Sequence, residues 1–498
     1  MDESKMIKIN PRDNVVVCLK PLPKGEILEV DGKKITLLQD TPAGHKVLLT
    51  DITAGTDIIK YGYPIGHATE DLKTGQWVNE NNLKTNLAGT LEYQYNPVNQ
   101  DVDIPLENLT FKGYKRANGE VGVRNEIWIV PTVGCVNGIA DRLVKTLTKE
   151  TKLEGIDAVH SWNHNYGCSQ LSDDHENTRK ILRDICQHPN AGGVLVLSLG
   201  CENNQPDQFM ELLGNYDKSR IKLLVTQKVV GDEMEEGMKL LREIYHVAKQ
   251  DKREDVPLSQ LRVGLKCGGS DGFSGITANP LVGSFSDFLV AQGGTTILTE
   301  VPEMFGAETI LMNRCKTPAL FSQTVEMIND FKEYFLSHGE PVGENPSPGN
   351  KAGGISTLED KALGCTQKCG HALVSGVLKY GERLKENGLN LLSAPGNDLV
   401  ASTALAAAGC QLVLFTTGRG TPFGTFVPTM KISTNNDIYA RKSNWMDFNA
   451  GELLKGVSMQ ALTRKFIDKI IAVASGEQTR NEENEYREIA IFKSGVTL

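Results

Sequence analysis

Several features that would restrict the function of a chain of 498 residues are missing from the sequence. No apolar run reaches about 18 residues, so no membrane span is expected. Basic residues are not in excess: 53 Lys and Arg against 62 Asp and Glu give a net charge of −9, and nucleic acid binding needs a basic field. The polar start MDESKMIKIN is unlike a secretory signal. These absences predict a cytoplasmic protein with no nucleic acid or membrane partner, in which an anionic ligand would need Lys or Arg within its own site.

The ten cysteines also lack a recognisable framework. The chain is too long for a small disulfide scaffold, so we expect reduced thiols that are free for catalysis, metal binding or packing. Cys365 and Cys369 have the spacing of metal ligands, but no partner pair follows, which argues against a zinc ribbon.

Length and pattern predict several domains. Short β segments with turn-rich connections predict a small all-β domain over residues 1–84, followed by a surface linker at 85–113. Buried-strand runs alternate with helical stretches over 114–255 and again over 256–498, which indicates two α/β domains with parallel sheets. A Pro- and Gly-rich segment at 340–357 is expected to be functional or disordered.

Three of the predicted strands in 114–255 end in Gly-Cys, and their cysteines (Cys135, Cys168 and Cys201) are 33 residues apart. Ligands of open parallel sheets bind outside the carboxyl ends of the strands. We therefore expect a functional rim that includes Cys201, Glu202, Asn203 and His164. The alternative is that each cysteine is a small buried filler.

Two further stretches are candidates for chemistry. CGGSDGFSG (267–275) is a Gly-rich loop whose backbone N–H groups could hold an anion, although a tight turn would give the same pattern. His45 and Lys46 lie at a predicted turn in AGHKV, where a lone His is often structural.

Long stretches of the chain are similar to a known enzyme family. They are AGHKVLLTDI, KYGYPIGHA, RANGEVGVRNEIWIVPTVGCVNGIA, YGCSQLSDDH, GLKCGGSDGFSGITANP, LTEVPEMFGAE, NPSPGNKAGGISTLEDKALGCTQK, LLSAPGNDLVA, FTTGRGTPFG and FKSGVTL. On these stretches the chain resembles the altronate and galactarate dehydratases over essentially its whole length, and the altronate branch more closely. The resemblance implies a β-clip (SAF-type) N-terminal domain, a middle α/β domain and a C-terminal Rossmann-like domain with a parallel sheet.

The resemblance also implies an activity and a cofactor. Members of the family are iron-dependent hydro-lyases that need reducing conditions, which implies Fe²⁺ with Mn²⁺ as a substitute, a sugar-acid substrate and a homodimer. The implied reaction converts D-altronate to 2-dehydro-3-deoxy-D-gluconate. Removing the C2 proton beside a carboxylate builds a doubly charged species, which a metal on the substrate would stabilise by several kcal/mol.

Site residues are assigned from what this reaction needs and from their positions, since two of the three expected metal ligands follow apparent strand ends. The expected metal ligands are Glu303, Cys365 and Asp398, and His45 is the expected base or acid, delivered by the β domain. Arg124 and Arg419 are candidate carboxylate clamps, because Arg pairs with carboxylates in a bidentate way. The full prediction is catalytic roles for His45, Lys46, Cys201 and Glu202, and substrate contacts for Arg124, Asn125, His164, Asn203, Ser270, Asp271 and Arg419.

Three alternatives remain open. The substrate could be galactarate or another sugar acid. Cys135, Cys168 and Cys201 could hold an iron–sulfur cluster, although Cys-x-x-Cys runs are absent. A sugar-acid sensor without catalysis would keep the β-clip domain and the cleft.

Overall fold

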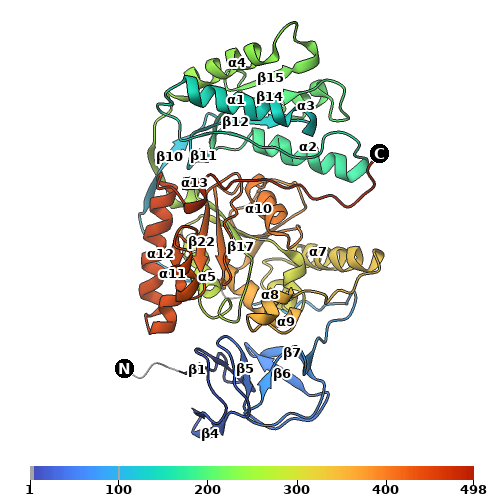
Figure 1. Ribbon diagram of the computed structural model, residues 1–498, viewed down its shortest axis with the longest axis vertical. Coiled ribbons are helices and arrows are strands. Elements are labelled where there is room, and N and C mark those ends of the chain that lie inside the picture. Colours follow the sequence, from blue (N-terminus) through green and yellow to red (C-terminus); the bar gives the residue numbers. More distant parts are fainter. Residues whose placement is uncertain (1–4, 99–100) are drawn as a thin grey trace.

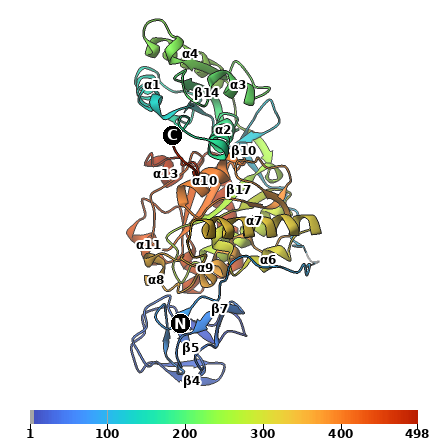
Figure 2. The same ribbon diagram turned by 90° about the vertical axis from the view of Figure 1, so that its right-hand side faces the viewer.

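The computed structural model describes residues 5–98 and 101–498. The first four residues of the predicted β domain and two residues of the predicted linker therefore lie outside the described residues. Figure 1 shows three bodies in a row, with the N-terminal β domain at one end and residues 114–255 at the other. The C-terminal domain, last in the sequence, lies between them in space, and the same order is visible in Figure 2.

The N-terminal domain consists of short antiparallel sheets. Its main sheet has the order β1-β2-β5-β8, beside the β3-β4 hairpin and a β6-β7-β9 sheet. Val15, Val17 and Val47 are buried between these layers, as the β-branched composition of the segments predicts. The strands are β1 (Met6–Ile7), β2 (Val15–Cys18), β3 (Ile27–Val30), β4 (Lys33–Thr36), β5 (Lys46–Leu48), β6 (Asp57–Lys60), β7 (Tyr63–Ala68), β8 (Trp77–Val78) and β9 (Leu83–Lys84).

The middle domain contains a four-stranded parallel sheet in the order β13-β12-β14-β15. Alternate residues of β12 point to opposite faces: Ile127 and Ile129 join one core cluster, and Trp128 and Val130 join the other. The first face is covered by α1 (Asn137–Glu150) and α4 (Glu233–Ala248), and the second by α2 (Ser172–Cys186), α3 (Pro206–Leu212) and part of the C-terminal domain. The strands are β12 (Glu126–Pro131), β13 (Val159–Ser161), β14 (Ala191–Ser198) and β15 (Ile221–Val225).

The C-terminal domain is built on a seven-stranded parallel sheet in the order β19-β20-β18-β17-β21-β22-β23. The chain enters at the central strand and extends the sheet to both sides, so a topological switch point lies beside β17, where open α/β sheets bind ligands. The strands are β17 (Arg262–Cys267), β18 (Thr295–Leu298), β19 (Val374–Leu378), β20 (Gly388–Leu392), β21 (Leu412–Thr417), β22 (Thr429–Ser433) and β23 (Phe448–Asn449). The helices are α5 (Ala278–Ala291), α6 (Glu308–Met312), α7 (Pro318–Ser337), α8 (Pro348–Ala352), α9 (Leu358–Cys365), α10 (Asp398–Ala407), α11 (Asn436–Arg441), α12 (Met459–Ala474) and α13 (Arg480–Glu483).

These observations confirm the predicted fold class. Small antiparallel sheets form the N-terminal region, and a large parallel sheet with flanking helices forms the C-terminal region. In the described part of the chain, no helix combines the length and the hydropathy that crossing a membrane requires.

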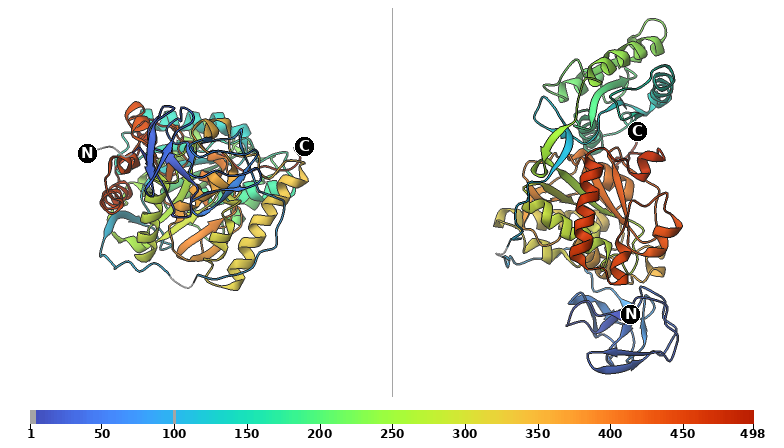
Figure 3. Two further views of the ribbon diagram at one scale, coloured as in Figure 1. Left: turned by 90° about the horizontal axis from the view of Figure 1, so that it is seen from below. Right: turned by 90° about the vertical axis from the view of Figure 1, so that its left-hand side faces the viewer.

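The domains are tied together by segments that the sequence pattern did not assign. A three-stranded sheet of β10 (Thr110–Lys115), β11 (Val121–Gly122) and β16 (Glu254–Pro257) joins the start and the end of the middle domain beside the C-terminal domain. The end of the chain returns to the middle domain, where the backbone N–H groups of Ser494 and Gly495 donate to Asp174. Figure 3 shows the C-terminus beside that domain, far from the N-terminal domain.

Candidate active site

Two thiols and one carboxylate meet at the carboxyl edge of the large sheet. Cys267 is the last residue of β17, Glu303 lies in the short turn after β18, and Cys365 is the last residue of α9. The sulfur of Cys365 lies 3.3 Å from that of Cys267 and 3.3 Å from Oε2 of Glu303, and the third distance is 3.5 Å. All three side chains are buried, and their potential ligand atoms lie within 4.8 Å of one another. Thiolate and carboxylate together are a donor set that Fe²⁺ accepts.

Three buried lysines surround this group. Lys361 Nζ donates to Glu303 at 2.8 Å, and Lys368 Nζ contacts the Cys267 sulfur at 2.7 Å. Lys266 and Lys368 both pair with Glu300, which carries a left-handed φ of 68°. A left-handed φ is uncommon for a residue other than glycine and is often found at functional sites. The lysines therefore bring concentrated positive charge to a site that contains a carboxylate and two thiols.

The charges of this site stabilise one another. Burial alone would raise the pKa of Glu303, but Lys361, Lys266 and Lys368 lower it to about 2. Burial disfavours the charged form of each lysine, yet the neighbouring acidic groups raise the pKa of all three above its ordinary value. At neutral pH the site thus holds an ionised Glu303 and three ammonium groups.

Asp398 is not a member of the thiol and carboxylate group. Its Oδ1 accepts from Lys266 Nζ at 2.9 Å, and its side chain is about one-third exposed. Within the described residues, Cys267 completes the three-residue group in place of Asp398. The expected ligand set is therefore corrected at this position, while metal binding by Glu303 and Cys365 stays a prediction.

The Gly-rich loop after β17 is held by its own residues and by the residues that follow β22. Asp271 accepts from Ser274, Thr434 and Asn435, so its carboxylate organises the loop and is not free for a substrate. Ser270 is buried, its hydroxyl has no hydrogen-bond partner within residues 5–98 and 101–498, and it lines a cavity of about 10 Å³ beside Cys365. The predicted substrate contact is thus corrected for Asp271. Ser270 has a hydroxyl group that is free to donate a hydrogen bond at the site.

His45 and Lys46 lie at the contact between the N-terminal and C-terminal domains. The ring of His45 accepts from Trp77 Nε1 at 3.1 Å and lies 3.2 Å from the carbonyl oxygen of Ala352, and burial lowers its pKa. Lys46 Nζ donates to Gly354 O, Ser356 Oγ and Asp360, all between 2.8 and 2.9 Å. Three acceptors satisfy all three N–H donors of an ammonium group, so Lys46 has no donor left for catalysis. Its predicted catalytic role is therefore corrected to that of attaching the two domains.

The segment 340–357 is ordered where it meets this domain contact. It contains α8, and its residues 352–356 supply the acceptors for His45 and Lys46. A Cβ at Gly272 would lie 2.0 Å from the backbone oxygen of Gly44, so the "AGHK" turn and the Gly-rich loop meet backbone to backbone. The N-terminal domain therefore closes directly over the carboxyl edge of β17.

Arg419 lies at the same edge and is exposed. It follows β21, and its backbone N–H donates to Gly269 O in the Gly-rich loop at 2.9 Å. Across the described ranges, no hydrogen-bond or ion-pair partner is found for its guanidinium group. The structure thus leaves this predicted carboxylate clamp free.

Replacing Arg419 by Ala should raise the KM for a sugar acid by about 10- to 100-fold, because a hydrogen bond to a charged group contributes about 1.5–3 kcal/mol. The kcat should change much less, and Arg419→Lys should lie in between, since Lys lacks the bidentate fork. Steady-state kinetics measure both parameters. Arg441→Ala, which removes an exposed cation on α11, is the control; an unchanged KM in Arg419→Ala would refute the clamp.

Four predicted residues lie in the middle domain, away from this edge of the large sheet (Figure 1). Glu202 is buried and accepts from Thr132 Oγ1 and from the backbone of Leu199 and Gly200. His164 is buried between a backbone oxygen and a backbone N–H, and burial lowers its pKa to about 4. Both are corrected to structural roles, whereas Cys201 and Asn203 are exposed at the rim.

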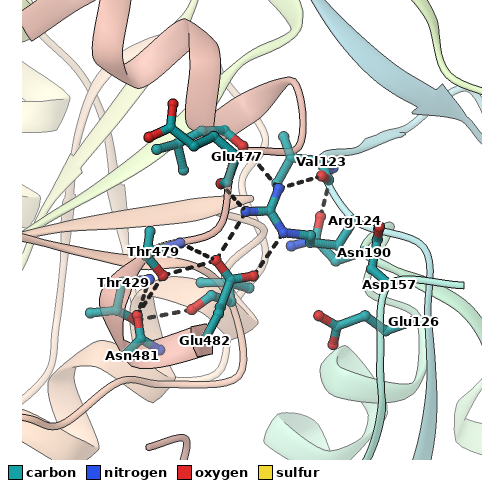
Figure 4. A network of polar contacts seen from close by, with 12 residues as sticks. Val123, Arg124, Glu126, Asp157, Asn190, Thr429, Glu477, Thr479, Asn481 and Glu482 are labelled. Atoms are coloured by element: carbon teal, nitrogen blue, oxygen red, sulfur yellow. Dashed lines mark hydrogen bonds and ion pairs between the residues drawn. The ribbon is translucent and has the colours of Figure 1, made fainter. Parts of the chain in front are cut away.

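Arg124 and Asn125 are buried between the middle and C-terminal domains. All five N–H donors of Arg124 are used: two pair with Glu482, and three reach backbone oxygens of Val123, Val473 and Glu477 (Figure 4). The amide of Asn125 donates to Gly155 O and Ala248 O. Neither side chain can contact a substrate, so both predictions are corrected to interdomain packing.

The sequence analysis missed four residues that complete the site, Lys266, Glu300, Lys361 and Lys368, and it included Cys267 only as the first residue of the Gly-rich stretch. One signal was present. Lys266 lies inside β17, one residue before the strand ends at Cys267, and a lysine in the buried part of a strand needs paired charges. The others lie in helices and turns whose approach to β17 depends on the tertiary fold.

Comparison with known families covers nearly the whole chain. Residues 4–86 match "Altronate/galactarate dehydratase SAF domain", residues 113–249 match "D-galactarate dehydratase/Altronate hydrolase, second domain", and residues 258–497 match "D-galactarate/Altronate dehydratase, C-terminal".

Individual relatives give the same picture. The chain is 58% identical over 494 residues to an altronate dehydratase of Bacillus subtilis and 56% identical over 493 residues to one of Escherichia coli, with 99% of each chain covered. It is 35% identical over 509 residues to a galactarate dehydratase (L-threo-forming) of Escherichia coli, which covers 98% of this chain and 96% of that protein.

Proposed function

Because the chain belongs to the altronate and galactarate dehydratase family, we propose that it dehydrates D-altronate to 2-dehydro-3-deoxy-D-gluconate. Membership makes it a sugar-acid dehydratase, a carbon–oxygen hydro-lyase. The identity of 56–58% to altronate dehydratases, against 35% to a galactarate dehydratase, supports D-altronate as the substrate. The main structural support for this proposal is the buried group of Cys267, Glu303 and Cys365, which is surrounded by lysines.

The residues at this edge of the sheet suit the difficult step of the reaction. Removal of the C2 proton places a second negative charge next to the carboxylate, and preorganised positive groups stabilise such charge most strongly where water is excluded. Lys266, Lys361 and Lys368 are buried and stay protonated, so they act by electrostatic stabilisation and do not accept the C2 proton. Arg419 would hold the substrate carboxylate from the open side.

Iron fits the donor set of this site. Cys267, Glu303 and Cys365 would hold Fe²⁺, with Mn²⁺ as a substitute, since two sulfur atoms and a carboxylate oxygen lie within 4.8 Å of one another. Bound there, the metal would supply Lewis-acid polarisation of the substrate's carboxylate and 2-hydroxyl group. The nearby lysines keep Glu303 ionised and ready to coordinate.

The N-terminal domain supplies the cover and the candidate acid or base. Neutral His45 belongs to the turn that closes on the Gly-rich loop, and its ring nitrogens are engaged by Trp77 and Ala352 in this conformation. Proton transfer by His45 therefore requires the "AGHK" turn to move when a substrate enters. The buried ion pair of Lys46 with Asp360 would re-form on closure and exclude water.

The assignment is tested by incubating the reduced, iron-loaded enzyme with D-altronate, galactarate and other sugar acids and measuring formation of 2-keto acid. We expect kcat/KM to be highest for D-altronate, with a 2-keto-3-deoxy product identified by mass spectrometry. A higher kcat/KM for galactarate would show that D-altronate is the wrong substrate but would leave the proposed dehydration reaction unchanged. Tight binding of these acids without any product would favour the sensor alternative and overturn the proposal.

A further inference from the structure

Three cysteines outside the candidate active site share one position at the ends of neighbouring strands. Cys135, Cys168 and Cys201 each follow a glycine and are exposed, whereas the other seven cysteines are buried. Their exposure rules out the interpretation as buried fillers. No step of the proposed dehydration uses them.

The fold brings the three Gly-Cys loops together. They follow β12, β13 and β14, which are adjacent in the order β13-β12-β14, and adjacent strands lie about 4.8 Å apart. The loops also bond to one another: Gly134 N donates to Tyr166 O, and Asn204 N donates to Gly167 O, both at 2.9 Å. One rim of the sheet therefore carries all three thiols.

The glycines make this approach possible. A Cβ at Gly167, where φ is 96°, would lie 2.0 Å from the backbone oxygen of Thr132, and a Cβ at Gly134 would lie 2.8 Å from that of His164. Any larger residue would separate the loops. Gly134 and Gly167 thus permit the contact between the loops, and the cysteine that follows each of them is exposed.

Polar atoms around the rim also lack partners. Asn204 is fully buried and Gln170 is 2% exposed, yet Oδ1 of the first and Nε2 of the second have no hydrogen-bond partner within the described ranges. The same holds for Oδ1 of Asn137 and Oδ1 of Asn163. Buried polar atoms without a partner are unfavourable, so the concentration of such atoms beside three thiols points to a ligand at the rim.

The spacing of the thiols distinguishes between occupants. A single tetrahedral ion with metal–sulfur bonds of about 2.3 Å needs sulfur atoms about 3.8 Å apart. The three sulfur atoms do not all lie within 4.8 Å of one another, unlike the donors of the Cys267 group. An iron–sulfur cluster binds each thiolate through a different iron and needs wider spacing. A Cys-x-x-Cys run is unnecessary, because three parallel strands supply the ligands.

We propose that Cys135, Cys168 and Cys201 bind a [4Fe–4S] cluster whose fourth iron has no cysteine ligand. Each thiol releases its proton on binding, as metal ligation requires. The open iron faces the rim and can take an external ligand such as water or a hydroxy acid. This site is separate from the proposed Fe²⁺ site in the C-terminal domain.

The test uses the full chain, purified without oxygen and reconstituted with Fe²⁺ and sulfide. We expect about four acid-labile sulfides per chain, with visible charge-transfer absorption. Each single Cys→Ser change at the three positions should lower the sulfide content, and the triple variant should hold none. Exposed substitutions of this kind have little effect on stability, so melting curves should stay close to those of the parent.

Two control variants separate this proposal from the proposed function. Cys186→Ala removes a buried thiol of the same domain and should keep the sulfide content, and so should Glu303→Gln. Loss of dehydration in Glu303→Gln with intact sulfide would leave both proposals standing. The cluster proposal would be overturned if the parent protein contained less than about half a sulfide per chain and bound zinc instead of iron and sulfide. It would also be overturned if the triple variant folded and still contained the cluster.

Discussion

Removing iron from the enzyme should abolish dehydration of D-altronate, and adding Fe²⁺ should restore it, with Mn²⁺ as a weaker substitute. The physical reason is the second negative charge that forms when the C2 proton leaves. Lewis-acid stabilisation of several kcal/mol corresponds to about three powers of ten in rate or more. The measurement is turnover before and after chelation, with iron content determined on the same samples.

Glu303→Gln locates this effect in the chain. The change is isosteric but removes the charge, so we expect a fall in kcat of at least about 10³-fold and loss of the iron that chelation removes. Glu308→Gln is the matched control, because Glu308 is also a buried carboxylate paired with a lysine, at 2.9 Å from Lys332 Nζ. Full activity in the chelated parent would refute the metal proposal, and an active, iron-loaded Glu303→Gln enzyme would move the metal elsewhere.

Arg124→Met should cause the largest loss of stability. The substitution leaves Glu482, which is paired with Arg124 Nε at 2.7 Å, as an uncompensated charge between the middle and C-terminal domains (Figure 4). Breaking a buried pair on one side costs about 3–5 kcal/mol. The measurement is the midpoint of urea-induced unfolding, monitored by tryptophan fluorescence.

A second pair of variants tests whether the cost comes from the charge left behind. Arg124→Met combined with Glu482→Met should recover part of the loss, as in a double-mutant cycle. Arg242→Met, which breaks an exposed ion pair with Glu150 on the same domain, should cost about 1 kcal/mol or less. If Arg124→Met shifted the urea midpoint as little as Arg242→Met does, the ion pair of Arg124 with Glu482 would not hold the domains together.

The position of Arg124 also shows why its predicted role was wrong. An arginine suits a carboxylate clamp as well as it suits an interdomain ion pair, because both use the same bidentate geometry. Its partner Glu482 is 358 residues away in the sequence, and no local pattern identifies it. Arg419, chosen by the same reasoning, lies free at the edge of the large sheet.

Periodicity alone determined the classes of structure. The mostly apolar runs 126–131 and 191–198 predict strands, since a strand covered on both faces must be apolar along most of its length. The amphipathic stretch 453–476 predicts a helix that Gly476 ends as a C-cap; the structure has α12 there, and Gly476 follows it with a φ of 118°. Local interactions determine where these strands and this helix form, so the sequence alone is sufficient to predict them.

The tertiary structure alone decided which polar residues share a site. The Gly-Cys repeat predicted a rim on the middle sheet, but the C-terminal domain lies between the middle domain and the N-terminal domain (Figure 1), so within one chain His45 and Cys201 belong to different sites. Cys267, Glu303 and Cys365 come from a strand end, a turn and a helix end separated by up to 98 residues. Their meeting depends on the order of strands in the sheet and on the packing of α9 against it, and these long-range contacts leave no periodic signal in the sequence.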